Sequence, residues 1–142
     1  MRFWDSSAVM PLLVPESRSA VLSALVKEDP ATAVWWATPV ECASALARLE
    51  REGRLTEAGW KSASVRLAAA GRGWTEVPPI ERVREQATRL LRLHTLRAAD
   101  SLQLAAAIVL ADFEPRTLEF VTLDRPLAAA ARREGFEVIG VV

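Results

Sequence analysis

Four acidic side chains in four well-separated segments are the residues of this sequence that could do chemistry together. They are Asp5, Glu41, Asp100 and Asp124. The set contains only carboxylates, which suit a hard cation such as Mg²⁺ or Mn²⁺ better than zinc. Proteins use such cations mainly on phosphate groups. We therefore expect a Mg²⁺ or Mn²⁺ site acting on a phosphate ester, if the fold brings the four acids together.

The elements that must position these acids are strands and helices that alternate along the chain. Asp5 directly follows a short apolar segment, and Asp124 ends a run rich in β-branched and aromatic residues. Glu41 lies in the first turn of a predicted helix, and Asp100 lies near the start of another. In a parallel sheet, the carboxyl ends of the strands and the amino ends of the following helices share one edge. The pattern thus predicts that the four acids meet at that edge.

The same alternation predicts the fold class. The predicted strands cover residues 2–4, 32–38, 73–79, 118–124 and 136–142. The predicted helices cover residues 15–29, 38–52, 55–71, 80–94, 97–113 and 125–135. We expect a single domain over residues 1–142, folded as a three-layer α/β/α sandwich around a mainly parallel sheet.

Each acid also has a purely structural explanation. Glu41 follows Thr38 at the spacing of a capping box, and Asp124 could cap the helix after it. Asp5 could belong to a turn with the two serines that follow, and Asp100 could favour the helix dipole. We favour a functional role for Asp5 and Asp100 because they adjoin apolar segments. Glu41 alone would be assigned to capping, and Asp124 alone is undecided. The metal hypothesis therefore depends on the convergence of all four.

The charge distribution excludes a strong overall attraction to nucleic acid. The net charge is zero, so the whole-molecule basic field of many nucleic-acid-binding proteins is absent. Between Ser44 and Arg97, however, 11 Lys and Arg residues stand against 6 Asp and Glu, a local net charge of +5. We expect most of these arginines to lie on solvated helix faces. Arg97, three residues before Asp100, is the exception that we expect to contact phosphate.

Cysteine and apolar content indicate a cytoplasmic protein without a membrane segment. Cys42 is the only cysteine, so no disulfide can form within the chain. We expect no signal peptide, and the longest apolar run, residues 104–111, is too short to cross a bilayer. Nucleophilic catalysis by Cys42 and His94 is not expected, because the cysteine lies on an apolar helix face and His94 ends a helix.

Four sequence motifs, taken in order, resemble the PIN domain, and most closely the VapC-type ribonuclease toxins. They are DSSAV after the first predicted strand, VECASAL at the start of a helix, LRAADSLQLAAA, and FVTLDRPLAAAARREGF near the end. Together they extend from Asp5 to Phe136. The resemblance implies a PIN-like, flavodoxin-like sandwich that binds Mg²⁺ or Mn²⁺ and cleaves RNA.

The resemblance also implies roles for individual residues and partners. The acids of the family fall on Asp5, Glu41, Asp100 and Asp124, and its hydroxyl residue after the first acid falls on Ser6. It implies an RNA substrate, a small antitoxin protein in a type II toxin–antitoxin pair, and a homodimer. Asp5, Asp100 and Asp124 would hold the metal, and Glu41 would complete its ligands or orient the attacking water.

Two other functions remain open at this point. A receiver-like binding module would share the fold class, but it needs an adjacent acidic pair after the first strand and a lysine after a late strand. Lys27 and Lys61 are the only lysines, and neither lies there. A catalytically inactive PIN-like interaction module would keep the fold and lose the chemistry, which four intact acids disfavour.

The five tryptophans divide into two groups. Trp4, Trp35 and Trp36 lie on predicted strands, and we expect them in the core. Trp60 and Trp74 lie in the helical middle and before a pair of prolines, where an apolar groove could receive a partner segment.

Overall fold

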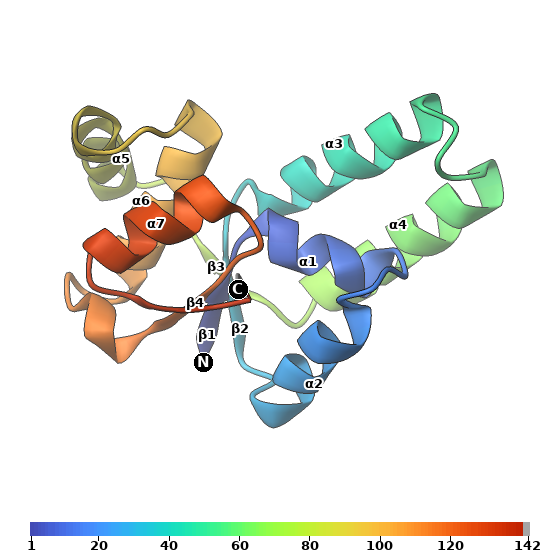
Figure 1. The fold of residues 1–142 in the computed structure, drawn as a ribbon, viewed down its shortest axis with the longest axis horizontal. Helices are drawn as coiled ribbons and strands as arrows, with labels where there is room; N and C mark the ends of the chain where they lie inside the picture. Colours follow the sequence, from blue (N-terminus) through green and yellow to red (C-terminus); the bar gives the residue numbers. More distant parts are fainter. Residues whose placement is uncertain (141–142) are drawn as a thin grey trace.

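A five-stranded parallel sheet forms the centre of the molecule (Figure 1). The computed structural model describes residues 1–140. The strands are β1 (Arg2–Trp4), β2 (Thr32–Trp35), β3 (Thr75–Val77), β4 (Glu119–Val121) and β5 (Glu137–Ile139). Their order across the sheet is β3-β2-β1-β4-β5, and every neighbouring pair is parallel. The prediction of a mainly parallel sheet is confirmed.

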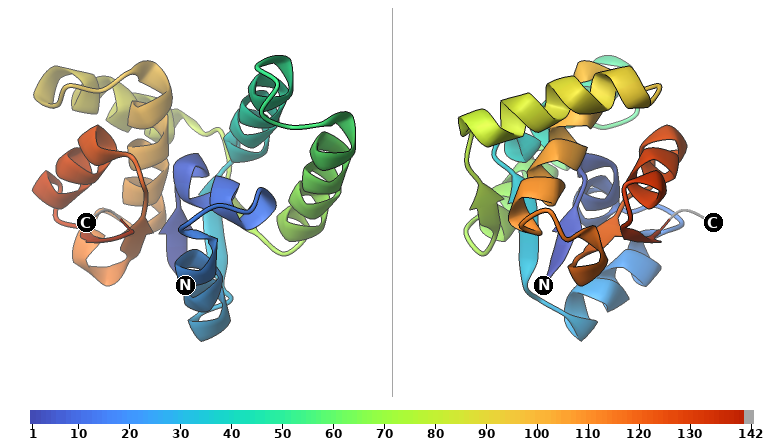
Figure 2. Two further views of the ribbon diagram at one scale, coloured as in Figure 1. Left: turned by 45° about the vertical axis from the view of Figure 1, so that its right-hand side comes forward. Right: turned by 90° about the vertical axis from the view of Figure 1, so that its left-hand side faces the viewer.

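Helices cover both faces of this sheet. They are α1 (Ser6–Leu13), α2 (Ser19–Glu28), α3 (Thr38–Arg51), α4 (Glu57–Gly71), α5 (Glu81–Leu93), α6 (Ala98–Leu110) and α7 (Arg125–Arg133), with a short 3₁₀ helix at Pro115–Thr117. Helices α1 to α4 lie on one side of the sheet and α5 to α7 on the other (Figure 1 and Figure 2). The molecule is therefore the expected three-layer α/β/α sandwich.

Successive residues of each strand point to opposite faces and build two separate cores. Phe3 and Phe120 stack, with ring centroids 5.3 Å apart, in the core beneath α5 to α7. Trp4 and Val121, the next residues on the same strands, belong to the core beneath α1 to α4. The outer strands β3 and β5 carry exposed residues, whereas β1, β2 and β4 are largely buried on both faces and are therefore mostly apolar rather than alternating. This is why three-residue strands could be recognised from the sequence.

The strand order creates a switch point between β1 and β4. The chain passes outward from β1 through β2 to β3, crosses back over the sheet, and passes outward again from β4 to β5. In parallel sheets, ligands bind beyond the carboxyl ends of the strands at such a point. Asp5 directly follows β1, and Asp124 is the third residue after β4. The topology thus places two of the four acids at the switch point.

The strand order also bears on the receiver-like alternative. Receiver domains have the order 2-1-3-4-5, whereas this sheet has the order 3-2-1-4-5. The receiver-like interpretation is therefore wrong at the level of topology.

Helix α1 is the element that the sequence did not predict. It begins directly after Asp5 and contains Pro11 in its interior. A proline inside a helix removes one backbone hydrogen bond and usually marks a break. The helix persists because Ala8, Val9, Pro11 and Leu13 are buried beneath the neighbouring helices.

The exposure of Trp36 and the end of the last strand differ from the predictions. Trp4 and Trp35 are buried as expected, but Trp36 is 53% exposed, because β2 ends at Trp35 and the next residue lies in a turn. The predicted last strand reached Val142, whereas β5 ends at Ile139; residues 141–142 lie outside the described part of the chain.

Among residues 1–140, no helix combines the length and the apolar character that a membrane crossing requires.

Candidate active site

Asp5 is the most deeply buried of the four acids, at 3% exposure. It caps the amino end of α1 and holds its two carboxyl oxygens in different environments. Oδ2 accepts hydrogen bonds from the Ser7 backbone N–H at 3.3 Å, from the Ser7 hydroxyl and from the Thr122 hydroxyl at 2.9 Å. Oδ1 has only a long contact from the Ser6 hydroxyl, at 3.4 Å. Oδ1 is therefore the oxygen with capacity left for a cation.

Glu41 lies next to Asp5 through a shared serine. The Ser6 hydroxyl that contacts Asp5 donates to Glu41 Oε2 at 3.0 Å, and the Gln103 side-chain amide donates to the same oxygen at 3.0 Å. The predicted capping box is wrong: α3 begins at Thr38, and Ala37 occupies the cap position without a side-chain bond. Glu41 thus turns toward the acids rather than toward its own helix end.

Thr38 and Glu41 instead share a hydrogen-bond donor, the side chain of Gln103. The buried Gln103 amide nitrogen donates to the Thr38 hydroxyl oxygen at 3.0 Å as well as to Glu41. Gln103 lies on α6, so these bonds tie α6 to the amino end of α3. The orientation of Glu41 is therefore set by two helices and not by α3 alone.

Asp100 and Asp124 complete the group of acids. Asp100 lies in the first turn of α6, as predicted, and is half-buried. Asp124 is the cap residue of α7, where its Oδ1 accepts from the Leu127 backbone N–H at 2.8 Å. The capping explanation for Asp124 is therefore correct, but one oxygen satisfies it. Oδ2 has no hydrogen-bond partner among residues 1–140 and stays open to a ligand.

The pKa shifts of Asp5, Glu41 and Asp100 reflect their burial and the charges of neighbouring acids. Burial raises the pKa of Asp5, and the nearby Asp100 charge raises it further. Burial likewise raises the pKa of Glu41, with smaller contributions from Asp5 and Asp100. The pKa of Asp100 is raised by burial and by Asp124, and Arg97 opposes this shift. Carboxylates that are buried beside other negative charges form a site that favours a cation or protons.

A groove of about 560 Å³ lies at this edge, and two of the four acids, Glu41 and Asp124, line it. Its walls are Ser6, Ser7 and Met10 at α1, Ala37, Val40, Glu41, Ser44, Ala45 and Arg48 at α3, and Arg97 and Asp124. The groove therefore combines carboxylates that can hold a cation with arginines that can bind an anion. That combination suits a phosphate ester bound across a metal ion.

The donor chemistry fits Mg²⁺ or Mn²⁺. All available ligand atoms are oxygens, and two of them, Asp5 Oδ1 and Asp124 Oδ2, lack strong hydrogen bonds. Within residues 1–140, no group of three or more His, Cys, Asp or Glu side chains is arranged to hold a metal ion directly. Mg²⁺ usually keeps several waters and binds through one or two carboxylates. An open set of oxygens is consistent with that mode of binding.

Sequence reasoning did not identify four residues of this site. Ser7, Thr122 and Gln103 hold the acids through hydrogen bonds, and Arg48 lines the groove. Ser7 could have been recognised, because it belongs to the DSSAV motif. Thr122 and Gln103 carry no local signal, since their partners lie 117 and 62 residues away in the sequence.

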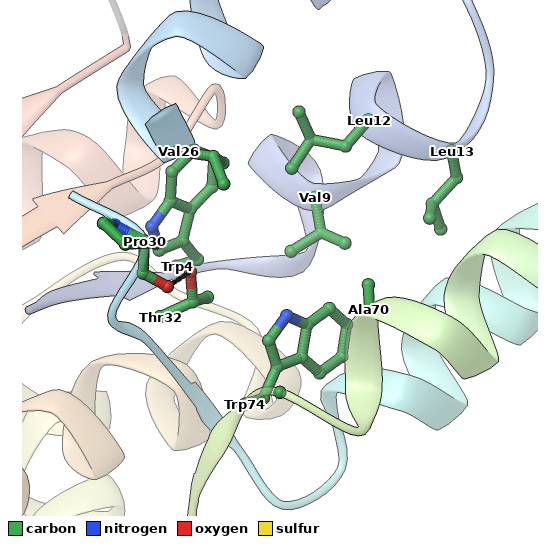
Figure 3. A pocket seen from close by; sticks show the side chains of 10 residues that line it. Trp4, Val9, Leu12, Leu13, Val26, Pro30, Thr32, Ala70 and Trp74 are labelled. Carbon is green, nitrogen blue, oxygen red and sulfur yellow. Dashed lines mark hydrogen bonds between the residues drawn. The ribbon is translucent and has the colours of Figure 1, made fainter. Parts of the chain in front are cut away.

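A second cavity, of about 170 Å³, lies between the sheet and helices α1, α2 and α4 (Figure 3). Trp4 and Trp74 line it together with aliphatic side chains, and it contains no ionisable group. It therefore offers no hydrolytic chemistry. Trp60 is half-buried and packs against the core beneath α1 to α4.

Cysteine and histidine stay outside the site, as predicted. Burial raises the pKa of the Cys42 thiol to about 12, so the reactive thiolate is not populated at neutral pH. His94 caps the end of α5, and its Nε2 lies 2.8 Å from Glu134 at the end of α7.

Two solved structures share this fold. PAE2754 from Pyrobaculum aerophilum aligns with a TM-score of 0.61 and 26% identity, covering 91% of this chain and 78% of that chain. A toxin–antitoxin complex from Klebsiella pneumoniae aligns with a TM-score of 0.66 and 15% identity, covering 99% and 97%. At 15% identity, the second likeness concerns the fold alone.

Sequence comparison identifies closer relatives, although no protein-family model matches the chain. Ribonuclease VapC45 from Mycobacterium tuberculosis strain CDC 1551 / Oshkosh and Ribonuclease VapC49 from strain ATCC 25618 / H37Rv are each 34% identical over 144 residues. Each alignment covers 96% of this chain and 92% of the relative. Similarity of this extent, together with the PIN-like sandwich and its edge of acids, shows that the chain belongs to the VapC family of ribonucleases.

Proposed function

We propose that this VapC ribonuclease is a Mg²⁺- or Mn²⁺-dependent endoribonuclease and the toxin of a type II toxin–antitoxin pair. The observation that supports the proposal best is the convergence of acids at the sheet edge, where Asp5 and Glu41 share the Ser6 hydroxyl and the charge of Asp100 adds to the burial that raises the pKa of both. Such a site binds a divalent cation readily because the cation relieves both repulsion and lost hydration.

Asp5, Asp100 and Asp124 would hold the metal, partly through water. Asp5 would bind through Oδ1, because Ser7 and Thr122 occupy its other oxygen. When bound, a metal of this kind acidifies a coordinated water and stabilises negative charge on the phosphoryl oxygens.

Glu41 would orient the attacking water and accept its proton. Its Oε2 is held by Ser6 and Gln103, which leaves Oε1 free to face the groove. In the hydrolysis, the oxygen of water bonds to phosphorus, one backbone P–O bond breaks, and a proton passes to the leaving oxygen. Arg97, exposed at the groove wall, would bind the phosphate before the reaction.

A small antitoxin protein is the proposed partner. The structure from Klebsiella pneumoniae that shares this fold is a toxin–antitoxin complex, which is consistent with a partner of the same kind here. Homodimerisation remains a prediction from the family resemblance.

The proposal is tested by cleavage of RNA by the purified protein. Wild type, Asp5→Asn and Asp112→Asn are incubated with total cellular RNA in EDTA, Mg²⁺ or Mn²⁺, and new RNA ends are sequenced. Asp112 is a fitting control because it is exposed and has a positive φ of 51°, which asparagine tolerates. We expect discrete cleavage by wild type and Asp112→Asn with metal only, and at least a 100-fold loss for Asp5→Asn.

Two results would contradict the proposal. Undiminished cleavage by Asp5→Asn would remove the acids from the reaction. No cleavage by wild type with either metal would leave the inactive interaction module as the better interpretation.

A further inference from the structure

We infer that Arg48 is a substrate-positioning residue, which binds a backbone phosphate of the RNA strand at the end of the groove away from the sheet. The inference rests on the proposed ribonuclease function and adds a residue and a direction of binding to it. Arg48 is the first arginine of the basic stretch, and its sequence position alone predicts only a solvated helix face for it.

The groove is lined on one side by a single face of α3. Five of its residues and its cap residue Ala37 line the groove; the five are Val40, Glu41, Ser44, Ala45 and Arg48. Their spacing of three and four residues is that of one face of an α-helix. Glu41 and Arg48 are seven residues apart, so Arg48 lies about 10.5 Å farther along the helix axis. Glu41 and Arg48 thus lie on the same wall of the groove, one near the acids and the other farther along α3.

Between Glu41 and Arg48, the α3 wall of the groove has only small side chains. Ser44 and Ala45 separate Glu41 from Arg48, and neither can fill the groove. A long side chain at either position would occupy the space beside the acids. The helix therefore leaves a channel that leads from the acid site to a guanidinium group.

Arg48 is free to take an anionic ligand. It is exposed and has no ion pair or hydrogen bond through its side chain among residues 1–140. The other basic wall residue, Arg97, begins α6 and interacts with Asp100. A chain with a negative charge at every unit can contact both arginines while one unit lies over the acids. A phosphodiester backbone has that chemistry, and arginine binds its phosphates in a bidentate manner.

The structural alternative for Arg48 is stabilisation of the α3 dipole, which a basic residue in the last turn of a helix provides. Arg51 shares that last turn, has the same charge, and is also exposed and without an ion pair among the described residues. Arg51 does not line the groove. Arg48→Gln and Arg51→Gln are therefore a matched pair that differs in access to the groove.

The test measures steady-state cleavage of a fluorescent 30-nucleotide single-stranded RNA pool of random sequence, in saturating Mg²⁺ at several salt concentrations. We expect Arg48→Gln to raise KM about tenfold and to change kcat by less than about twofold. The slope of log KM against log salt should fall by about 0.7, the value for one lost phosphate contact to a single strand. Arg48→Lys should recover most of the loss, and Arg51→Gln should match wild type.

A second variant tests the channel without a change of charge. Ser44 is exposed, so Ser44→Leu should fold and should raise KM by obstructing the groove, with an unchanged salt slope. Equal KM values for wild type, Ser44→Leu and Arg48→Gln would overturn the inference.

The outcomes separate this inference from the function on which it rests. Cleavage by wild type with no difference between Arg48→Gln and Arg51→Gln would overturn the role of Arg48 alone. An unchanged KM for Arg48→Gln, with weaker binding to a co-expressed antitoxin, would assign Arg48 to the protein partner and also overturn it. Failure of wild type to cleave in any metal would overturn both proposals.

Discussion

At the scale of residues, the hydroxyl groups of Ser7 and Thr122 connect Asp5 to the backbone through a hydrogen-bond network. The Leu123 and Asp124 backbone N–H groups donate to the Ser7 and Thr122 hydroxyl oxygens at 2.9 and 3.1 Å. Both hydroxyls in turn donate to Asp5 Oδ2. Each hydroxyl has one proton, so none remains for the 3.2 Å contact between the two oxygens. Because each hydroxyl also accepts a hydrogen bond, it is a stronger donor to the ionised Asp5 carboxylate.

This environment predicts a pH dependence for the metal-free protein. Burial raises the pKa of folded Asp5 above its ordinary value of 3.8, so the folded state holds the proton more tightly than the unfolded state. The free energy of unfolding therefore falls as pH rises above the unfolded pKa. In EDTA, Asp5→Asn should raise the free energy of unfolding by about 1–3 kcal/mol at pH 7.5. This gain in stability from Asp5→Asn should disappear near pH 3, where Asp5 is protonated in both the folded and the unfolded state of wild type.

Urea unfolding at a series of pH values checks this prediction, with Asp29 as a control of opposite sign. The amino-terminal ammonium of Met1 lowers the pKa of Asp29, so its ionised form stabilises the folded state above pH 4. Asp29→Asn should therefore lower stability at pH 7.5. A stability difference for Asp5→Asn that does not vary with pH would contradict the prediction.

At the scale of elements, the amino ends of α1, α3, α6 and α7 each deliver one acid. Only α1 and α7 use that acid as a cap, through Asp5 and Asp124. The other two helices begin without a side-chain cap, and Glu41 and Asp100 lie one turn inside them. Helix starts are suited to this task because their backbone dipoles stabilise nearby carboxylates by about 0.3–1 kcal/mol each.

The double role of Asp124 can be separated by two substitutions. Asparagine keeps an oxygen for the Leu127 N–H, whereas alanine does not. In metal-free protein, Asp124→Ala should lower the free energy of unfolding by about 1 kcal/mol. Asp124→Asn should match wild type or exceed it, since the repulsion of Asp100 is also reduced. Both variants should lose RNA cleavage.

Denaturant unfolding and RNA cleavage, measured on the same preparations, distinguish the two roles. Cleavage by Asp124→Asn at the wild-type rate would show that Asp124 is a cap and nothing more.

At the scale of the whole molecule, the acid site depends on folding and should in turn stabilise the fold. The four acids come from segments up to 119 residues apart, so the unfolded chain cannot present them together. A metal that binds only the folded state raises stability by mass action, by about 2.7 kcal/mol at a free concentration 100 times its dissociation constant. Mg²⁺ or Mn²⁺ should therefore raise the melting temperature of wild type.

Thermal melts in EDTA and in excess Mg²⁺ or Mn²⁺ provide the measurement. Asp112→Asn should respond as wild type does, because Asp112 lies on the exposed turn after α6. Asp5→Asn should respond weakly. A wild-type melting temperature that neither metal changes would argue against a metal site.

Local sequence patterns were enough to predict the fold class and to place the four acids at the ends of strands and the starts of helices. Strands buried on both faces are mostly apolar, so β1 and β4 could be recognised, together with Asp5 directly after β1 and Asp124 three residues after β4. The prolines and glycines that punctuate the chain made the starts of α3 and α7 predictable. These signals are local, and local patterns are what a single sequence records best.

The hydrogen bonds that hold the acids and the residues that surround them depend on contacts between distant segments, and the sequence did not predict them. Thr122 and Gln103 reach Asp5 and Glu41 across 117 and 62 residues of sequence, and no local spacing encodes such pairs. The same packing turned Glu41 away from Thr38, preserved α1 despite Pro11, and left Trp36 exposed. It also set Arg48 in the groove and Arg51 outside it, although the two are chemically identical. Side-chain environment is a property of contacts between distant segments, and it exists only once the layers have packed together.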